Sequence, residues 1–236
     1  MNPDTGHEAA PRHAVYFAPP PQHPLWALGC AWLGRDPADG PPRAGPPQPL
    51  VAEPWRYGFH ATLKAPMRLA DGVPESQWLA AVRALARRHE PFAMPPLRVG
   101  MLSGFISLRL AEPLQARHPL RRLADDCVQA LDRWRAPLSG PERIRQLQPS
   151  LSARQRENVE RHGYAHVLDD WRFHMSLSNP LAGIDSERIV ALHGAAERHF
   201  APALALPLAC DALCVFVEPA AGQAFELRHR FALGAA

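Results

Sequence analysis

The octapeptide FHATLKAP at residues 59–66 is echoed by FHMSLSNP at residues 173–180. In both copies a histidine follows a phenylalanine, a hydroxyl residue lies two positions after the histidine, and a proline ends the stretch. Each copy leads through a short loop into an amphipathic helical pattern, at residues 75–89 and 185–200. The repeated order of strand, helix and two further strands predicts a duplicated, two-lobed α+β fold. We expect two antiparallel sheets that face a central cleft, with the helices on the outside.

Alternation along a strand places the polar side chains of each copy on one face. Successive side chains in a strand point to opposite faces, so His60, Thr62 and Lys64 are predicted to share a face. The same spacing puts His174 and Ser176 on one face of the second strand. If the two lobes pair with approximate two-fold symmetry, two imidazoles and two hydroxyl groups enter one cleft.

The rest of the chain supplies the other elements of such a fold. We expect a single two-lobed domain over residues 1–236, with lobe 1 at about 13–115, a connecting helical segment at about 116–168 and lobe 2 at about 169–236. Residues 136–151 show no periodicity and are predicted to be irregular. Further helices are predicted at residues 24–33, 119–134 and 152–162, and strands at residues 13–18, 56–65, 97–101, 105–110, 172–178, 206–209, 213–217 and 225–233.

The composition limits the class of protein. Apolar residues make up 47% and charged residues 21%, so the chain can bury a sizeable core. The formal net charge of +3 favours an anionic ligand without indicating a nucleic-acid-binding tract. No apolar run approaches the ~20 residues of a membrane-spanning helix, and the polar start of the chain holds no apolar leader, so we expect a cytoplasmic protein. The four cysteines, none in a CxxC pair, are predicted to be buried free thiols.

Two histidines and two hydroxyl groups in one cleft suit the cleavage of a phosphate ester. One neutral imidazole removes a proton from the attacking water, and a protonated one donates a proton to the leaving oxygen. Thr62 and Ser176 can donate hydrogen bonds to the non-bridging oxygens as the phosphorus becomes five-coordinate. We expect neither a metal nor a cofactor, because the sequence has no HExxH, no CxxC and no carboxylate cluster.

A structural interpretation competes with this one, since strand histidines can simply satisfy hydrogen bonds in a core. Two copies at the same place in a repeated unit favour the catalytic interpretation of His60 and His174. Other residues are weaker candidates for binding substrate: Lys64, the only lysine of the chain, Tyr16, Arg172 and Arg135. Whether the segment from Arg135 to Arg145 covers the cleft as a lid is left open.

These motifs resemble the signature of the two-histidine phosphoesterase superfamily, a pair of H-x-[ST]-hydrophobic motifs in duplicated lobes. Finer similarity points to a branch associated with bacterial phosphonate-utilisation operons. The resemblance implies a two-lobed fold, a cytoplasmic setting and phosphoesterase activity. Members commonly carry threonine where this chain has Ser176, which keeps the hydroxyl donor but lacks the methyl group. The resemblance to this branch lies in YFAP at 16–19, WLG at 32–34, YGFHATLK at 57–64, RAPL at 135–138, GY at 163–164 and FH at 173–174.

The sequence thus favours a metal-independent phosphodiesterase that hydrolyses a small cyclic phosphate ester, with a place in phosphonate metabolism implied by the resemblance. A first alternative is an RNA-end-processing enzyme, a 2′,3′-cyclic phosphodiesterase or an enzyme like a 2′–5′ ligase. A second alternative is a catalytically silent accessory protein that binds a phosphate ligand. The expected partner is a small phosphate ester rather than nucleic acid or a membrane. The acid and base roles of the histidines, the regioselectivity and the oligomeric state stay open.

Overall fold

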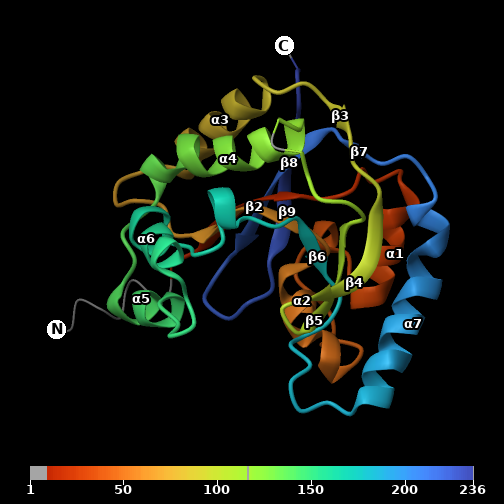
Figure 1. Ribbon diagram of the computed structural model, residues 1–236. Helices are drawn as coiled ribbons and strands as arrows, with labels where there is room; N and C mark the ends of the chain where they lie inside the picture. Colours follow the sequence, from red (N-terminus) through yellow and green to blue (C-terminus); the bar gives the residue numbers. More distant parts are fainter. Residues whose placement is uncertain (1–9, 116, 236) are drawn as a thin grey trace.

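Two antiparallel sheets form the centre of the molecule in the computed structural model, which describes residues 10–115 and 117–235 (Figure 1). Residues 1–9, on which most of the expectation of a leaderless start rests, lie outside the described part. The large sheet has the strand order β2-β1-β8-β9, with β1 (Arg12–Phe17), β2 (Ala61–Met67), β8 (Ala212–Glu218) and β9 (Glu226–Ala232). The second has the order β4-β5-β6, with β4 (Leu97–Leu102), β5 (Phe105–Leu110) and β6 (His174–Ser176). A short pair joins β3 (Phe92–Ala93) to β7 (Ala209–Cys210).

The two sheets do not divide at the boundaries expected for the two lobes. In the large sheet, β1 pairs on one side with β2 and on the other with β8 from the end of the chain. In the second sheet, β5 pairs with β6 across a long stretch of sequence. Each sheet therefore takes strands from both halves, because the repeated units exchange strands when they pack.

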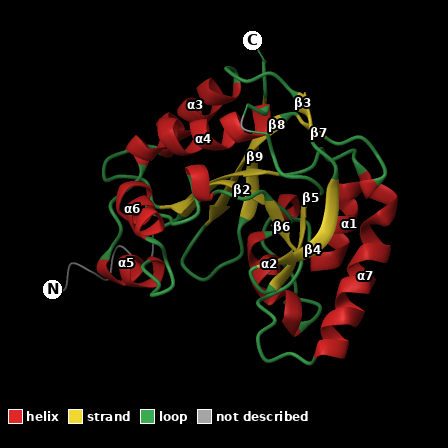
Figure 2. Cartoon of the chain, in the orientation of Figure 1, coloured by secondary structure: helices red, strands yellow, loops and turns green. Residues whose placement is uncertain are grey.

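The helices lie outside the sheets (Figures 1 and 2). Two helices pack against the large sheet. Two others pack against each other, and one of these also contacts β4. The first pair is α3 (Glu75–Ala86) and α4 (Pro119–Leu131), the second is α1 (Pro24–Leu33) and α7 (Ser186–Leu204), and the others are α2 (Ala52–Tyr57), α5 (Gly140–Gln146) and α6 (Ala153–His162). Short 3-10 turns occur at Pro37–Asp39, Pro49–Val51, Asp132–Trp134 and Leu168–Asp170. The predicted α+β class, with antiparallel sheets and outer helices, is confirmed.

Helix ends follow the signals in the sequence. Pro24 begins α1, and Gly34 ends it with φ at 79°, a left-handed conformation that glycine adopts without strain. Ser152 caps α6, and the side chain of Gln155 returns a hydrogen bond to the Ser152 backbone. A second capping box, at Ser139, begins α5 inside the segment that was predicted to be irregular.

The core explains the phenylalanine that precedes each motif histidine. Phe59 is fully buried and stacks on Phe200 with ring centroids 5.9 Å apart. Gly29 of α1 leaves room for this ring, since a Cβ there would lie 2.0 Å from Phe59. Phe173 packs on Phe17 with centroids 5.8 Å apart. All four cysteines are buried and free, as predicted, and no helix in the described part of the chain has the length and apolarity needed to cross a bilayer.

Candidate functional site

His60 lies between α2 and β2, and its ring is held by the backbone. Nδ1 lies 2.8 Å from the carbonyl oxygen of Gly58. Because a carbonyl can only accept a hydrogen bond, Nδ1 carries the proton of the neutral ring and Nε2 carries the lone pair. The hydroxyl of Thr62 lies 3.3 Å from Nε2. The first motif thus presents an imidazole nitrogen beside a hydroxyl.

His174 is the first residue of β6 and has the same arrangement. Its Nδ1 lies 2.8 Å from the carbonyl oxygen of Arg172, again two residues earlier. Its Nε2 is therefore also the nitrogen without a proton when the ring is neutral. The two sequence motifs therefore share one hydrogen bond, from Nδ1 of the histidine to the carbonyl oxygen two residues earlier.

A cavity of about 230 Å³ lies where the two sheets meet and brings the two motifs together. His174 and Thr62 both line it. His60 is not a lining residue, but its Nε2 lies 3.3 Å from the hydroxyl of Thr62. The indole nitrogen of Trp171 donates a 2.8 Å hydrogen bond to the backbone carbonyl of Thr62, which ties the segment before β6 to β2. The lining residues are Thr62, Leu102, Ser103, Phe105, Tyr164, His166, Asp170, Trp171, Arg172 and His174.

The environment keeps both motif histidines neutral near pH 7. Burial is the main cause that lowers the pKa of His60 to about 3, and the nearby His174 lowers it further. Burial also lowers the pKa of His174, and the positive charge available to His166 adds to the effect. A bound phosphate would oppose these effects, because an anion stabilises an imidazolium.

Tyr16 lies against His60 rather than at the cavity wall. The two rings stack with centroids 3.7 Å apart and planes 22° from parallel. Tyr16 is 1% exposed, and burial raises the pKa of its hydroxyl well above the usual value, so it stays a phenol. Tyr57 is the last residue of α2, and its ring centroid lies 6.2 Å from that of His60. Tyr16 is therefore placed to hold the imidazole.

Lys64 does not share the face of Thr62, in contrast to the strict alternation predicted. Thr62 pairs with Tyr16 and Lys64 pairs with Val15, so a bulge at β2 leaves one extra residue between the pairs. Because cross-strand partners share a face and Val15 and Tyr16 alternate, Thr62 and Lys64 point to opposite faces. Lys64 is buried and forms a 2.8 Å ion pair with Asp132.

The other predicted residues divide between the cavity and its surroundings. Arg172 lines the cavity and is exposed. Ser176 lies on β6 opposite Ser107, two residues along from His174, and is not among the residues that line the cavity. Arg135 bonds to Asp132 at 3.0 Å and to a backbone carbonyl at the end of α6. Arg145 is exposed on α5 and does not line the cavity.

Much of the cavity wall comes from residues that the sequence motifs did not indicate. Tyr164, His166 and Trp171 belong to the segment between α6 and β6, which has no periodicity to reveal a side-chain direction. Ser103 belongs to the tight turn between β4 and β5, where it and Gly104 have φ values of 46° and 86°. The short gap between the strands predicted at residues 97–101 and 105–110 was the only signal for this part of the wall.

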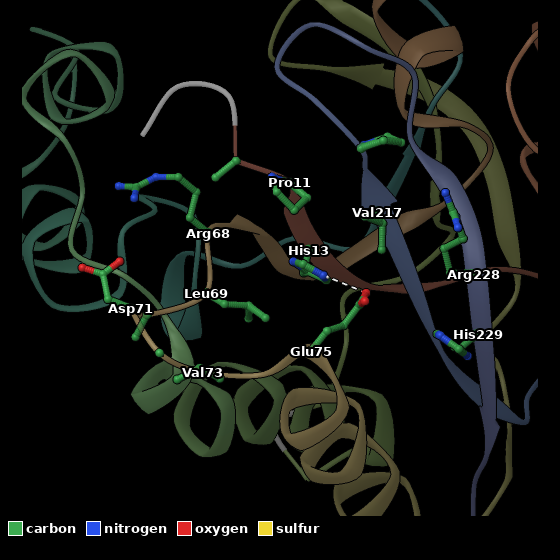
Figure 3. Close-up of a pocket in the computed structure, with 14 residues that line it drawn as sticks. Pro11, His13, Arg68, Leu69, Asp71, Val73, Glu75, Val217, Arg228 and His229 are labelled. Atoms are coloured by element: carbon green, nitrogen blue, oxygen red, sulfur yellow. Dashed lines mark hydrogen bonds and ion pairs between the residues drawn. The ribbon is translucent and has the colours of Figure 1, made fainter. Parts of the chain in front are cut away.

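A larger cavity of about 820 Å³ lies away from both motifs, beside the start of β1, the end of β8 and part of β9 (Figure 3). Figure 3 shows His13 and Glu75 in contact within it, at 3.0 Å. Arg68 and Arg228 each form an ion pair with a glutamate, at 3.0 and 2.7 Å. His13 and Glu75 both line the cavity, whereas Glu142 and Glu226, the partners of Arg68 and Arg228, do not. Across residues 10–115 and 117–235, no three His, Cys, Asp or Glu side chains gather as metal ligands do.

Comparison with known proteins identifies the family. A family model described as "Protein of unknown function (DUF1045)" matches residues 62–226. Two relatives are called "Ribose 1,5-bisphosphate phosphokinase PhnN", one from Janthinobacterium sp. (strain Marseille), 38% identical over 228 residues, and one from Laribacter hongkongensis (strain HLHK9), 40% identical over 222 residues. Each match covers 92% of this chain and 50% of the relative, so the chain spans about half the length of these curated relatives.

A solved structure of E. coli LigT complexed with NADP+ is similar over 95% of this chain and 98% of that chain, with 15% identity and a TM-score of 0.46. The family model covers well over half of the residues and includes both hydroxyl positions, Thr62 and Ser176, and the second histidine, His174. The chain therefore belongs to the DUF1045 family.

Proposed function

We propose that this chain hydrolyses a small cyclic phosphodiester by acid–base catalysis with His60 and His174. The observation that carries the proposal is the matched pair of imidazoles. Each has Nδ1 fixed on the carbonyl two residues earlier, which leaves Nε2 for proton transfer. A histidine with a purely structural role also needs a hydrogen-bond partner for its ring. The same hydrogen bond on two histidines beside one cavity is the arrangement that a general acid and a general base require.

We propose separate roles for the two histidines. Burial lowers the pKa of His60 to about 3, so this ring stays neutral, and we take His60 as the base. Nε2 of His60 takes a proton from water as the water oxygen attacks phosphorus. The bond from phosphorus to one ring oxygen breaks, and that oxygen takes the proton from Nε2 of His174. The product is a phosphomonoester, and exchange with solvent returns both rings to their starting state.

Two side chains at the cavity are placed to hold the charge that develops on the phosphate oxygens. The hydroxyl of Thr62, which lies 3.3 Å from Nε2 of His60, can turn to donate to a non-bridging oxygen once substrate is bound. Arg172 lines the same cavity with a guanidinium that uses only one nitrogen on backbone carbonyls. These donors replace the hydrogen bonds that water gives to the phosphate.

The size of the cavity and the names of the relatives point to a sugar phosphate as substrate. A cavity of about 230 Å³ accommodates a small molecule. The relatives are named for a kinase of ribose 1,5-bisphosphate. Opening the 1,2-cyclic phosphate of ribose 5-phosphate at the 2-oxygen gives ribose 1,5-bisphosphate. We therefore place this chain one step before that kinase reaction, a step that suits phosphonate metabolism.

The kinase activity itself is not proposed for this chain, which covers only half of each relative. Phosphate-loop kinases bind nucleotide through a glycine-rich loop that ends in lysine and a hydroxyl residue. Lys64, the only lysine here, follows Leu63 in a strand and is paired with Asp132. The sequence contains no GxxxxGK[ST] motif.

Phosphorus NMR tests the proposed substrate directly. The 1,2-cyclic phosphate of ribose 5-phosphate is incubated with the protein in EDTA, beside 2′,3′-cyclic AMP as the RNA-end alternative. The proposal predicts conversion of the sugar substrate to ribose 1,5-bisphosphate and slower turnover of the nucleotide. Faster turnover of 2′,3′-cyclic AMP would favour the RNA-end alternative, and binding of both compounds without turnover would favour the silent phosphate-binding protein.

A further inference from the structure

A second cavity, of about 560 Å³, adjoins the proposed catalytic cavity. The two share Leu102, Trp171 and Arg172 as lining residues, so a single ligand can extend from one into the other. The second cavity is lined by four arginines, Arg98, Arg109, Arg121 and Arg172, and by two carboxylates, Glu112 and Asp169. Its side chains therefore carry a net positive charge.

Three of the four guanidinium groups of this cavity donate hydrogen bonds to backbone carbonyls. Arg109 donates to the carbonyl of Met101 at 2.7 Å, and Arg121 donates to that of Leu168 at 2.6 Å. Arg172 donates to two carbonyls at 2.8 Å. The nearest carboxylate in an ion pair with any of the four is 3.9 Å away, beside Arg121. Arg98, Arg109 and Arg172 thus keep unused donors and a charge that no carboxylate neutralises in the described part of the chain.

Of the 21 arginines outside this cavity, fewer than half form a close ion pair with a carboxylate. Nine of them form ion pairs with Asp or Glu at 3.5 Å or less: Arg12, Arg56, Arg68, Arg135, Arg143, Arg154, Arg161, Arg228 and Arg230. None of the four arginines beside the catalytic cavity forms an ion pair this short with a described residue. An anion that comes from outside the protein would supply the missing partner.

The register of the second sheet lines up three of the basic groups. Arg98 pairs with Arg109, and Arg109 pairs with His174. Cross-strand partners share a face, so a row of two arginines leads from the second motif histidine across the sheet. Gly100 makes room for this row, since a Cβ there would lie 3.0 Å from Arg109 and 3.6 Å from Arg98. Like charges directly opposite each other destabilise a sheet unless an anion lies between them.

We propose that this cavity is a subsite for a second phosphate group of the substrate, a phosphomonoester on the same small molecule as the cyclic phosphate. The assignment rests on the proposed function and gives a binding site to the phosphomonoester of its substrate. The cyclic phosphate lies between the histidines, and the second phosphate lies among Arg98, Arg109 and Arg172. Arginine forks bind phosphate through two parallel hydrogen bonds.

A single-stranded nucleic acid fits this surface less well. Proteins that bind such strands stack bases on aromatic rings beside the basic groove. Trp171 is the aromatic ring common to both cavities, and it is buried with its indole nitrogen bonded to Thr62. Arg121 already lies over its ring at 5.6 Å. Trp171 therefore offers no free stacking surface at the boundary between the two cavities.

Calorimetric titration with ribose 1,5-bisphosphate and with ribose 1-phosphate tests the subsite without any turnover. Arg98→Gln is the cleanest variant, because the Arg98 side chain is exposed and forms no hydrogen bond or ion pair with the described residues. Arg188→Gln, an equally exposed arginine on α7, is the matched control for loss of one charge. Arg98→Gln is expected to weaken binding of the bisphosphate about tenfold and to leave binding of ribose 1-phosphate unchanged. Arg188→Gln is expected to change neither.

Equal affinity of the wild type for the two ligands, or equal weakening of both by Arg98→Gln, would overturn the subsite. Tighter binding of a cyclic-phosphate-ended oligonucleotide through the same arginine would replace the small bisphosphate by RNA. The outcome is separable from the proposed function. Arginine-dependent binding without hydrolysis of any cyclic ester would keep the subsite and refute the catalysis, and hydrolysis with a KM indifferent to the second phosphate would do the reverse.

Discussion

The Nδ1 atoms of His60 and His174 each lie 2.8 Å from the backbone carbonyl oxygen of the residue two positions earlier. The two motifs lie in different sheets, yet they fix the same ring nitrogen in the same way. The orientation of each imidazole therefore depends on local backbone geometry rather than on a distant side chain. Changes in that geometry should affect the reaction before they affect the fold as a whole.

Gly58 supplies the carbonyl that holds His60, and replacing it with alanine tests this dependence. Gly58 has φ at 78° and ψ at 173°, a conformation found almost only in glycine, and a Cβ there would lie 2.9 Å from Pro37. Gly58→Ala is expected to lower the free energy of unfolding by about 1–3 kcal/mol and kcat by at least about tenfold. Chemical denaturation and steady-state kinetics measure the two effects.

Gly72→Ala is the matched control for this variant. Gly72 also has a positive φ, 75°, but nothing lies within 4 Å of its Cβ position. It is expected to lose about 1–2 kcal/mol of stability and none of the activity. A Gly58→Ala protein as active as the Gly72→Ala protein would show that the carbonyl contact does not set the position of His60.

Tyr16 is expected to keep His60 neutral by covering its ring. Tyr16→Phe retains the stacked ring, so it should leave the pKa of His60 and kcat near their wild-type values. Tyr16→Ala admits water beside the imidazole, and the pKa of His60 should rise toward its ordinary value as the desolvation is relieved. NMR titration of the His60 ring measures the change. An unchanged pKa in Tyr16→Ala would mean that other groups desolvate the ring.

The lowered pKa of His60 predicts a loss of stability in acid. The unfolded chain binds a proton at this histidine near pH 6.5, whereas the folded protein does so only near pH 3. The stabilising contribution is therefore complete above about pH 6.5 and is lost as the pH falls toward 3. The His60→Gln protein lacks this titrating group. As the pH falls from about 6.5 toward 3, its free energy of unfolding should therefore decrease less steeply than that of the wild type, by up to about 1.4 kcal/mol per pH unit. Parallel pH slopes for the two proteins would contradict the low pKa.

The pH dependence of kcat/KM follows from the proposed roles. The base must be neutral and the acid protonated, and burial lowers the pKa of the acid, His174, below its ordinary value. The rate should therefore be highest on the acid side of about pH 6.5 and fall about tenfold per pH unit at higher pH. A rate that rises through this range would indicate that the chemistry is limited by a base with a higher pKa than His60.

Features that depend on local sequence could be predicted. The helices predicted at residues 24–33 and 152–162 begin within one residue of these bounds, because Pro24 and the cap at Ser152 act within a few residues. The strands predicted at residues 97–101 and 105–110 are joined by the tight turn at Ser103-Gly104. The repeated phenylalanine and histidine also fixed which strands carry the candidate site, because a buried ring before a polar position marks a strand at the edge of a core.

Features that depend on pairing between distant strands could not be predicted. Alternation was extended to residues 56 and 57, which form the last turn of α2. The bulge that turns Lys64 toward Asp132 depends on the register with β1, which no pattern within β2 reveals. The exchange of strands between the sheets and the cavity wall around Trp171 also arise only from tertiary packing.

The measurement that tests the central proposal most directly is turnover of the 1,2-cyclic phosphate of ribose 5-phosphate, in EDTA, by His60→Ala and His174→Ala proteins. His193→Ala, which removes a partly exposed imidazole from α7, is the control. Wild type and His193→Ala are expected to be equally active. Each motif variant should have a kcat at least about 100-fold lower than that of the wild type and an unchanged unfolding temperature. Activity that survives in both motif variants, or that EDTA abolishes in the wild type, would contradict catalysis by the histidine pair.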